Sequence, residues 1–99
     1  MLLYQFKALY YFVDIIDFSL FPNPANKFVK IDLEQLVGQE VDVQIFNNLG
    51  VEVKSIHIDH VWSKYKRIDL KDLREGFYTV WIKSPNRKPL AKTFMIGKF

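Results

Sequence analysis

The residue types best suited to chemistry gather in one short segment, His57-Ile58-Asp59-His60. Imidazole and carboxylate groups are common metal ligands. A zinc site normally has four protein ligands, or three protein ligands and a water molecule. Side chains alternate between the two faces of a β-strand, so His57 and Asp59 share a face and His60 points away from them. Three ligands therefore do not converge within this segment. We expect ordinary surface polar residues here, with no metal and no cofactor.

Other features that could support catalysis are weak. The carboxylate pairs Asp14/Asp17 and Asp69/Asp72 have the residue types of an acid–base couple, but nothing around them predicts a cleft. The chain has no cysteine, its four serines lie outside any nucleophile motif, and no glycine-rich phosphate loop is present. The sequence therefore predicts a protein that is not an enzyme.

Aromatic and basic residues alternate in the segment WSKYKR, residues 62–67. Such a pattern suits a sugar-stacking platform or a groove for single-stranded nucleic acid. Trp62, Tyr65 or, later in the chain, Trp81 could serve as the stacking surface of a carbohydrate-binding module. A strand with one aromatic face and basic residues facing water would give the same pattern, and scattered exposed aromatics need no special cause. We expect no nucleic-acid partner.

Charge is unevenly distributed along the chain. Residues 1–49 carry three lysines against six acidic residues, a net charge of −3, and residues 50–99 carry eleven basic residues against five acidic ones, a net charge of +6. The basic half could favour an anionic partner such as lipopolysaccharide. Lysines on the outer faces of strands, where they discourage edge-to-edge aggregation, would explain the same excess.

Short segments of alternating hydrophobicity, separated by turn residues, predict one all-β domain. Hydrophobic residues make up 49% of the chain and aromatic residues 16%, which suits a folded core and pleated surfaces. The expected strands are 18–21, 27–33, 41–45, 51–54, 62–70, 77–83 and 90–96, with a loop over 34–40. Turn signals recur about every ten residues, as in small antiparallel sandwiches.

The turn chemistry gives more local expectations. Pro22 and Pro24 should end the first strand, because neither can donate a backbone hydrogen bond. The segment from Asn47 to Gly50 should form a hairpin turn, because its residues tolerate positive φ. The alternation slips near Ser55, which predicts a bulge or a bend. Residues 1–17 are aromatic-rich and should be a linker or an extra strand, and an unpaired strand there could drive dimerisation.

Four segments, in order, resemble the type A C-terminal sorting domain of the type IX secretion system, found in Bacteroidetes-type bacteria. Residues 18–26 (FSLFPNPAN) are similar to the opening motif of these domains, and residues 43–53 (VQIFNNLGVEV) to their hairpin. Residues 68–80 (IDLKDLREGFYTV) and 92–96 (KTFMI) are similar to the two elements that follow. The motif positions in this chain are Pro22, Asn23, Pro24, Ala25, Leu49, Gly50, Gly76, Tyr78 and Lys92.

The resemblance implies an immunoglobulin-like β-sandwich over residues 18–99 that acts as a secretion signal at the end of a cargo protein. The cargo would pass through the periplasm, be recognised by an outer-membrane translocon and reach the cell surface or the medium. A sortase-like peptidase would often cut near the start of the domain, and the cargo would commonly be joined to anionic lipopolysaccharide. The glycines and prolines should maintain shape, and the last strand near Lys92 should form part of the recognised surface. The alternative function is an immunoglobulin-like carbohydrate-binding or adhesion module.

Overall fold

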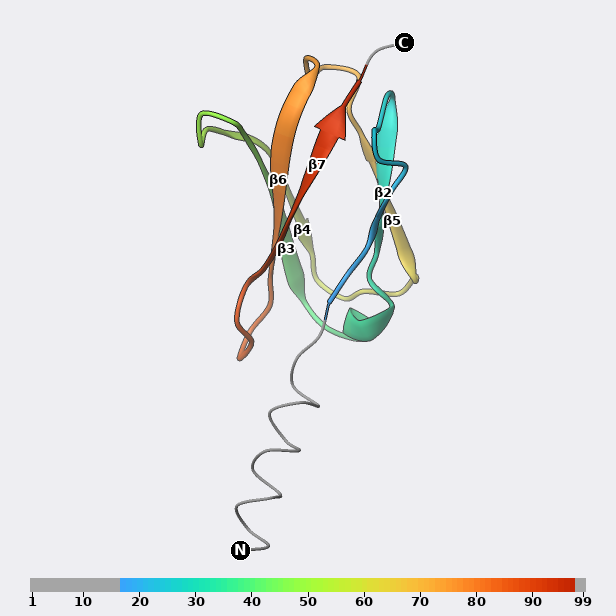
Figure 1. Ribbon diagram of the computed structural model, residues 1–99. Coiled ribbons are helices and arrows are strands. Elements are labelled where there is room, and N and C mark those ends of the chain that lie inside the picture. Colours follow the sequence, from blue (N-terminus) through green and yellow to red (C-terminus); the bar gives the residue numbers. More distant parts are fainter. Residues whose placement is uncertain (1–16, 98–99) are drawn as a thin grey trace, which may run out of the picture.

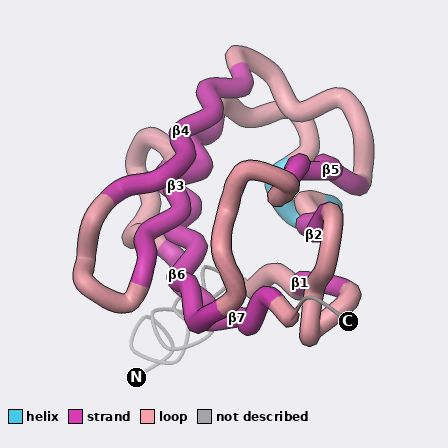
Figure 2. Tube along the Cα trace, turned by 90° about the horizontal axis from the view of Figure 1, so that it is seen from above, coloured by secondary structure: helices cyan, strands magenta, loops and turns pink. Residues whose placement is uncertain are grey.

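Two antiparallel sheets face each other in a sandwich (Figures 1 and 2). The computed structural model describes residues 17–97, so the linker or extra strand predicted over 1–17 lies outside the described residues except for Asp17. One sheet has the order β1-β2-β5 and the other the order β4-β3-β6-β7. The strands are β1 (Leu20–Phe21), β2 (Phe28–Asp32), β3 (Val41–Asn47), β4 (Glu52–Ile58), β5 (Tyr65–Asp69), β6 (Gly76–Lys83) and β7 (Leu90–Ile96). The predicted all-β sandwich is confirmed.

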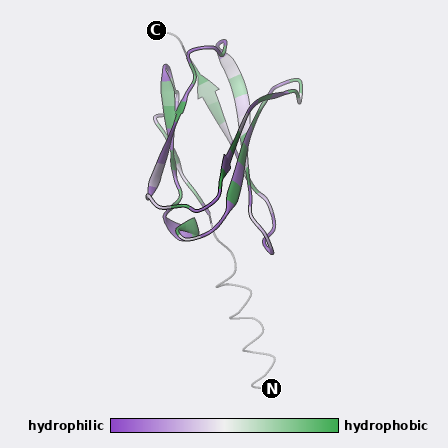
Figure 3. Ribbon diagram, turned by 180° about the vertical axis from the view of Figure 1, so that it is seen from behind, coloured by the Kyte–Doolittle hydropathy of each residue, from purple (hydrophilic) through white to green (hydrophobic). Residues whose placement is uncertain are grey.

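The core forms because each strand directs every second side chain into the space between the sheets. Hydrophobic and hydrophilic bands accordingly alternate along the strands in Figure 3. The buried residues on the strands are Val29, Ile31, Val41, Val43, Ile45, Ile68, Tyr78, Val80, Ile82, Phe94 and Ile96. The faces predicted for β2, β3 and β6 from their alternation are therefore the faces that form the core.

The structure differs from the sequence prediction in two connections. The strand expected over 62–70 begins only at Tyr65, and Trp62 lies in the preceding loop with 81% of its surface exposed. The predicted loop at 34–40 contains one turn of 3-10 helix, η1 (Glu34–Leu36), whose Leu36 is buried. No helix within residues 17–97 has the length and apolar character needed to cross a membrane.

The predicted irregularity in β4 is present but lies closer to the hairpin turn than Ser55. The register between β3 and β4 shifts between Ile45, which pairs with Lys54, and Phe46, which pairs with Glu52. Val53 is therefore the extra residue of a bulge. The bulge changes the face of the following residues, so that Val53 and the later Ile56 and Ile58 all pack against the core.

The β3–β4 turn uses the chemistry predicted for it. The Asn47 side-chain oxygen accepts hydrogen bonds from the backbone N–H groups of Leu49 at 2.9 Å and Val51 at 3.0 Å. Gly50 has a φ of +79°, in the left-handed region that favours glycine. One side chain and one glycine thus set the direction in which the chain returns.

Tyr78 holds the corner between β5 and β6. Its hydroxyl group donates a hydrogen bond of 2.6 Å to the backbone carbonyl of Arg74, and its side chain is buried in the core, 5.8 Å from the ring of Phe94 between centroids. Immunoglobulin-like sandwiches use a tyrosine in the corresponding place, where the phenol ties the corner to the strand that follows it. The motif position at Tyr78 therefore has a structural role in this chain.

We predict that Tyr78→Phe lowers the free energy of unfolding by about 1–2 kcal/mol, because the Arg74 carbonyl loses its donor while the ring stays in place. Urea denaturation followed by fluorescence would measure the change. Tyr65→Phe is the matched control, because it removes the hydroxyl group of a tyrosine that is 45% exposed and should change stability by less than about 0.5 kcal/mol. Equal losses in the two variants would contradict the role assigned to Tyr78.

Candidate functional site

Most of the motif positions gather at one end of the sandwich, the end at the top of Figure 1. Asn47 at the end of β3 pairs with Tyr78, and Gly76 at the start of β6 pairs with Ile96 at the end of β7. Ala25 forms an isolated bridge with the same Ile96. The opening motif, the β3–β4 turn and the β5–β6 corner therefore lie at the same end of the sandwich, although they are far apart in the sequence. We call this end the recognition end.

The opening motif is joined to the last strand by backbone hydrogen bonds. The N–H of Ala25 donates to the carbonyl of Met95 at 2.8 Å, and the N–H of Gly97 donates to the carbonyl of Ala25 at 2.8 Å. The Asn23 side-chain oxygen accepts from the N–H of Met95 at 3.1 Å. Ala25 is completely buried, and the peptide bonds before Pro22 and Pro24 are cis. The segment therefore covers the free edge of β7 near its end.

Large apolar side chains remain exposed at this same end. Leu49 and Val51 in the β3–β4 turn are 81% and 55% exposed, and Phe77 at the start of β6 is 64% exposed. Exposed apolar groups that cluster on a small domain often mark a protein contact. The buried motif residues Ala25 and Tyr78 thus set the shape of the recognition end, while its exposed apolar residues are available to a partner.

Lys92 lies apart from the recognition end. It pairs with Val80 in the middle of β6 and shares the inward face of β7 with the buried Phe94. Its Nζ atom lies 3.1 Å from the Asp17 carboxylate and 6.0 Å from the centroid of the Phe18 ring. Lys92 therefore contacts the beginning of the described chain, a placement that the strand pattern alone did not predict.

The Asp17 carboxylate is stabilised in its charged form. It accepts a hydrogen bond of 2.8 Å from the N–H of Phe18, and this bond, together with that from Lys92, lowers the pKa of Asp17 below its ordinary value of 3.8, with a small opposing effect of burial. The N–H of Asp17 donates to the side-chain oxygen of Gln35 at 3.1 Å. The entry of the chain into the sandwich is thus held by charge and hydrogen bonds.

The candidate stacking residues do not share one surface. Trp62 and Tyr65 line a shallow hollow together with Arg67, and Tyr65 lies on the outer face of the three-stranded sheet. Trp81 pairs with Gln44 and Ala91 and alternates with buried neighbours, so it lies on the outer face of the four-stranded sheet. The thickness of the sandwich therefore separates Trp81 from the other two rings.

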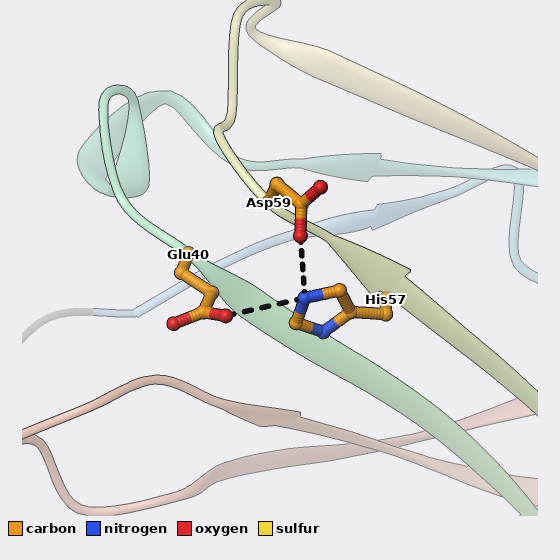
Figure 4. Close-up of side chains that lie close together, drawn as sticks. All are labelled: Glu40, His57 and Asp59. Atoms are coloured by element: carbon orange, nitrogen blue, oxygen red, sulfur yellow. Dashed lines mark hydrogen bonds and ion pairs between the residues drawn. The ribbon is translucent and has the colours of Figure 1, made fainter.

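A cluster around His57 forms at the opposite end of the β3–β4 hairpin from the turn (Figure 4). His57 Nε2 lies 2.8 Å from Asp59 Oδ1 and 3.2 Å from Glu40 Oε2, and His57 Nδ1 lies 2.6 Å from Asp42 Oδ1. The hydrogen bond to Asp42, together with that to Asp59, raises the pKa of His57 against a smaller effect of desolvation. His60 instead stacks on Trp62, with 3.9 Å between ring centroids.

The two residues that sequence reasoning missed in this cluster come from another strand. Asp42 is the register partner of His57, and Glu40 immediately precedes β3. The alternation of β3 places Asp42 on the outer face, so the sequence could have indicated that its side chain is exposed. The pairing of Asp42 with His57, however, depends on the hairpin register. The bulge at Val53 sets that register.

The two carboxylates of the pair Asp69/Asp72 make separate structural contacts. Asp69 accepts a hydrogen bond of 2.9 Å from the N–H of Lys71, and Asp72 lies 3.0 Å from the Nζ atom of Lys54. In the pair Asp14/Asp17, Asp14 lies outside the described residues. Neither pair thus presents two facing carboxylates within residues 17–97.

We predict that Asp17→Asn lowers the free energy of unfolding by a few tenths of a kcal/mol at about pH 7, since exposed ion pairs contribute little. The lowered pKa means that this stabilisation is present above pH 3.8 and is lost as the pH falls through the folded-state pKa. Denaturation curves at about pH 7 and about pH 2 should therefore differ between the proteins only at the higher pH. A difference in stability of the same size at both pH values would show that the charge of Asp17 is not the cause of the stabilisation.

One family matches nearly the whole described chain. Residues 19–96 match the secretion system C-terminal sorting domain, a match that begins just after Phe18 and ends with the last residue of β7. A comparison with curated proteins finds no match. The match spans far more than half of the 99 residues and includes both the segment that covers β7 and the recognition end. The chain therefore belongs to the family of C-terminal sorting domains of the type IX secretion system.

Proposed function

We propose that this chain is the C-terminal sorting signal that directs a cargo protein across the outer membrane by type IX secretion. The family match over residues 19–96 carries this conclusion. Membership implies interaction with the type IX machinery and export to the cell surface or the medium. The family is not known for catalysis. A sorting signal needs a stable, readable surface, and we propose that the cargo passes through the periplasm before that surface is read.

The translocon would contact the recognition end. Leu49, Val51 and Phe77 present exposed apolar surface there, and the buried core and the Tyr78 corner beneath them keep the backbone in one shape. A preformed apolar surface loses little conformational entropy on binding, which favours recognition of a folded domain. The N–H of Met95 donates to the Asn23 side-chain oxygen and the N–H of Ala25 donates to the Met95 carbonyl, and these bonds hold the last strand in the same unit.

A sortase-like peptidase would cut close to the start of the domain. Asp17 is exposed at the edge of the sandwich and Phe18 is buried within it, so the change from accessible to buried chain falls between neighbouring residues. Cleavage needs an accessible backbone, so a cut on the N-terminal side of Phe18 is favoured over a cut within the buried strands. Lys92 would keep this boundary in position through its contact with Asp17.

An anionic lipopolysaccharide would contact the outer face of the three-stranded sheet. The Arg67 guanidinium lies 3.9 Å from the centroid of the Phe28 ring, and the rings of Phe21 and Tyr65 pack edge to face at 5.4 Å. Lys30 pairs with Phe21 on one side and Arg67 on the other. Cations beside aromatic rings suit a phosphorylated sugar, because the charge binds phosphate and the rings stack on the sugar.

The carbohydrate-binding or adhesion alternative has no support from the family match. Its strongest feature is the exposed Trp62, which lies with Tyr65 beside one hollow. A glycan module would show saturable binding on a glycan panel that is lost in Trp62→Ala, and a sorting signal would be secreted normally with that substitution.

We predict that this domain, fused to the C-terminus of a periplasmically exported fluorescent protein, moves the reporter to the cell surface or the medium in a bacterium with a type IX system. Fluorescence of the fractionated cells and medium would measure the transfer. A reporter without the domain, and the fusion in a strain that lacks the translocon, should both stay in the periplasm. If the fusion also stays there, the sorting function is wrong.

We predict further that Leu49→Asp in this fusion reduces secretion several-fold, because a charge replaces apolar contact at the recognition end. Trp62→Asp is the matched control: both side chains are 81% exposed, and Trp62 lies in the β4–β5 connection at the other end of the sandwich. Both variants should keep wild-type unfolding curves. Loss of secretion in the Trp62 variant alone would move the translocon contact away from the recognition end.

A further inference from the structure

Three side chains direct their ligand atoms to one point at the open end of the β3–β4 hairpin (Figure 4). Glu40 immediately precedes β3, His57 belongs to β4, and Asp59 immediately follows β4. The Nε2 atom of His57 lies 2.8 Å from Asp59 Oδ1 and 3.2 Å from Glu40 Oε2, and the three ligand atoms lie within 4.8 Å of one another. The donors thus come from both strands of one hairpin and face each other.

Asp42 determines which nitrogen of His57 is available. Its carboxylate lies 2.6 Å from Nδ1, a position that suits a hydrogen bond donated by an Nδ1–H group to Asp42 and leaves Nε2 for a ligand. The Nε2 atom then faces two carboxylate oxygens, and a lone pair there would repel them. The three ligand atoms are close enough together for one cation to contact all of them. A carboxylate that orients the ring of a ligating histidine in this way is a regular feature of metal sites.

The backbone around the ligands is already held in place. The N–H of Gly38 donates to the carbonyl of Val61 at 2.8 Å, and the N–H of Val61 donates to the carbonyl of Gln39 at 2.9 Å. These bonds join the segment that leads into Glu40 to the segment that follows Asp59. The ladder between β3 and β4 fixes His57 opposite Asp42. Binding an ion therefore requires the movement of exposed side chains and not of the backbone.

The ligand set selects the kind of ion. Zinc takes nitrogen and carboxylate ligands at about 2.0–2.2 Å in tetrahedral geometry, which separates neighbouring ligand atoms by about 3.4 Å. The distances of 2.8 Å and 3.2 Å from His57 Nε2 to the two carboxylate oxygens are shorter than that separation, so the exposed carboxylates must move outward to admit the ion. Calcium and magnesium prefer sites made only of oxygen atoms. An imidazole with two carboxylates favours zinc over these ions.

We propose that Glu40, His57 and Asp59 form a binding site for one zinc ion, with water in the fourth position and Asp42 orienting the imidazole. The ion would join the residue before β3 to the residue after β4. Strand β4 is an edge of the four-stranded sheet, so the ion would fasten that edge at the end opposite its turn. This site goes beyond the sorting function and lies away from the recognition end.

Calorimetric titration of the full, untagged chain with zinc chloride at about pH 7.5 tests the site. We expect saturable binding of one ion per chain, at least tenfold weaker in Glu40→Gln and lost in His57→Ala. Asp42→Asn should weaken binding by about 10–100-fold, because the ring loses its orienting carboxylate. His60→Ala is the matched control, since it removes the neighbouring imidazole that stacks on Trp62, and it should bind zinc as the parent chain does.

Thermal unfolding supplies an independent readout. An ion that binds only the folded chain should raise the unfolding midpoint by on the order of 10 °C when zinc is in about 100-fold excess over its dissociation constant. Calcium chloride should leave the midpoint unchanged. The proposal is overturned by the absence of saturable zinc binding, by zinc binding that survives in His57→Ala, or by calcium binding as tight as zinc binding. Circular dichroism of each variant would establish that it is folded.

Discussion

Burial of one row of apolar side chains on each strand is the interaction on which the rest of this structure depends. Residues such as Val43, Val80 and Ile96 are almost completely buried between the sheets, and each contributes about 1.5–3 kcal/mol relative to an exposed position. Because the side-chain period of a strand is two, burying one row also fixes which residues face outward. The exposed groups of the recognition end and the cluster around His57 are consequences of that choice.

The ends of the sandwich are shaped by a few specific hydrogen bonds. The Tyr78 phenol closes the β5–β6 corner on the carbonyl of Arg74, and Asn47 closes the β3–β4 turn. Ala25 and Asn23 occupy the free edge of β7, where unpaired backbone groups would otherwise be open to pairing with another chain. The opening motif of the family thus has a physical role here: it covers an edge strand and ties residues 23–25 to the end of β7.

Different kinds of side chain are exposed on different parts of the domain. Apolar groups are exposed at the recognition end, and cations and aromatic rings occupy the outer face of the three-stranded sheet. His57 and the three carboxylates that contact it lie at the open end of the β3–β4 hairpin. A small sandwich can carry several contacts because its core needs only the inward rows. The outward-facing residues can therefore differ from one part of the surface to another without a change of fold.

The sequence by itself determined the features that depend on neighbours along the chain. The alternation of Val41, Val43 and Ile45 predicted a half-buried strand, the segment ending at Gly50 predicted the hairpin turn, and the order of the motifs indicated the family, which the match over 19–96 confirms. Even the irregularity of β4 was visible as a slip in the pattern, although it was placed at Ser55 and the extra residue is Val53.

Only the tertiary structure decided which distant residues meet. The contact of Lys92 with Asp17, the bridge of Ala25 to Ile96 and the pairing of His57 with Asp42 all depend on strand order and register. A hydrophobic pattern states that a strand has a buried face, but many pairings of such strands bury equal area. The register depends on the packing of the whole core, on turn geometry and on one bulge. For that reason, single segments of the sequence can suggest which residue types form a site, but they do not show which distant residues come together in it.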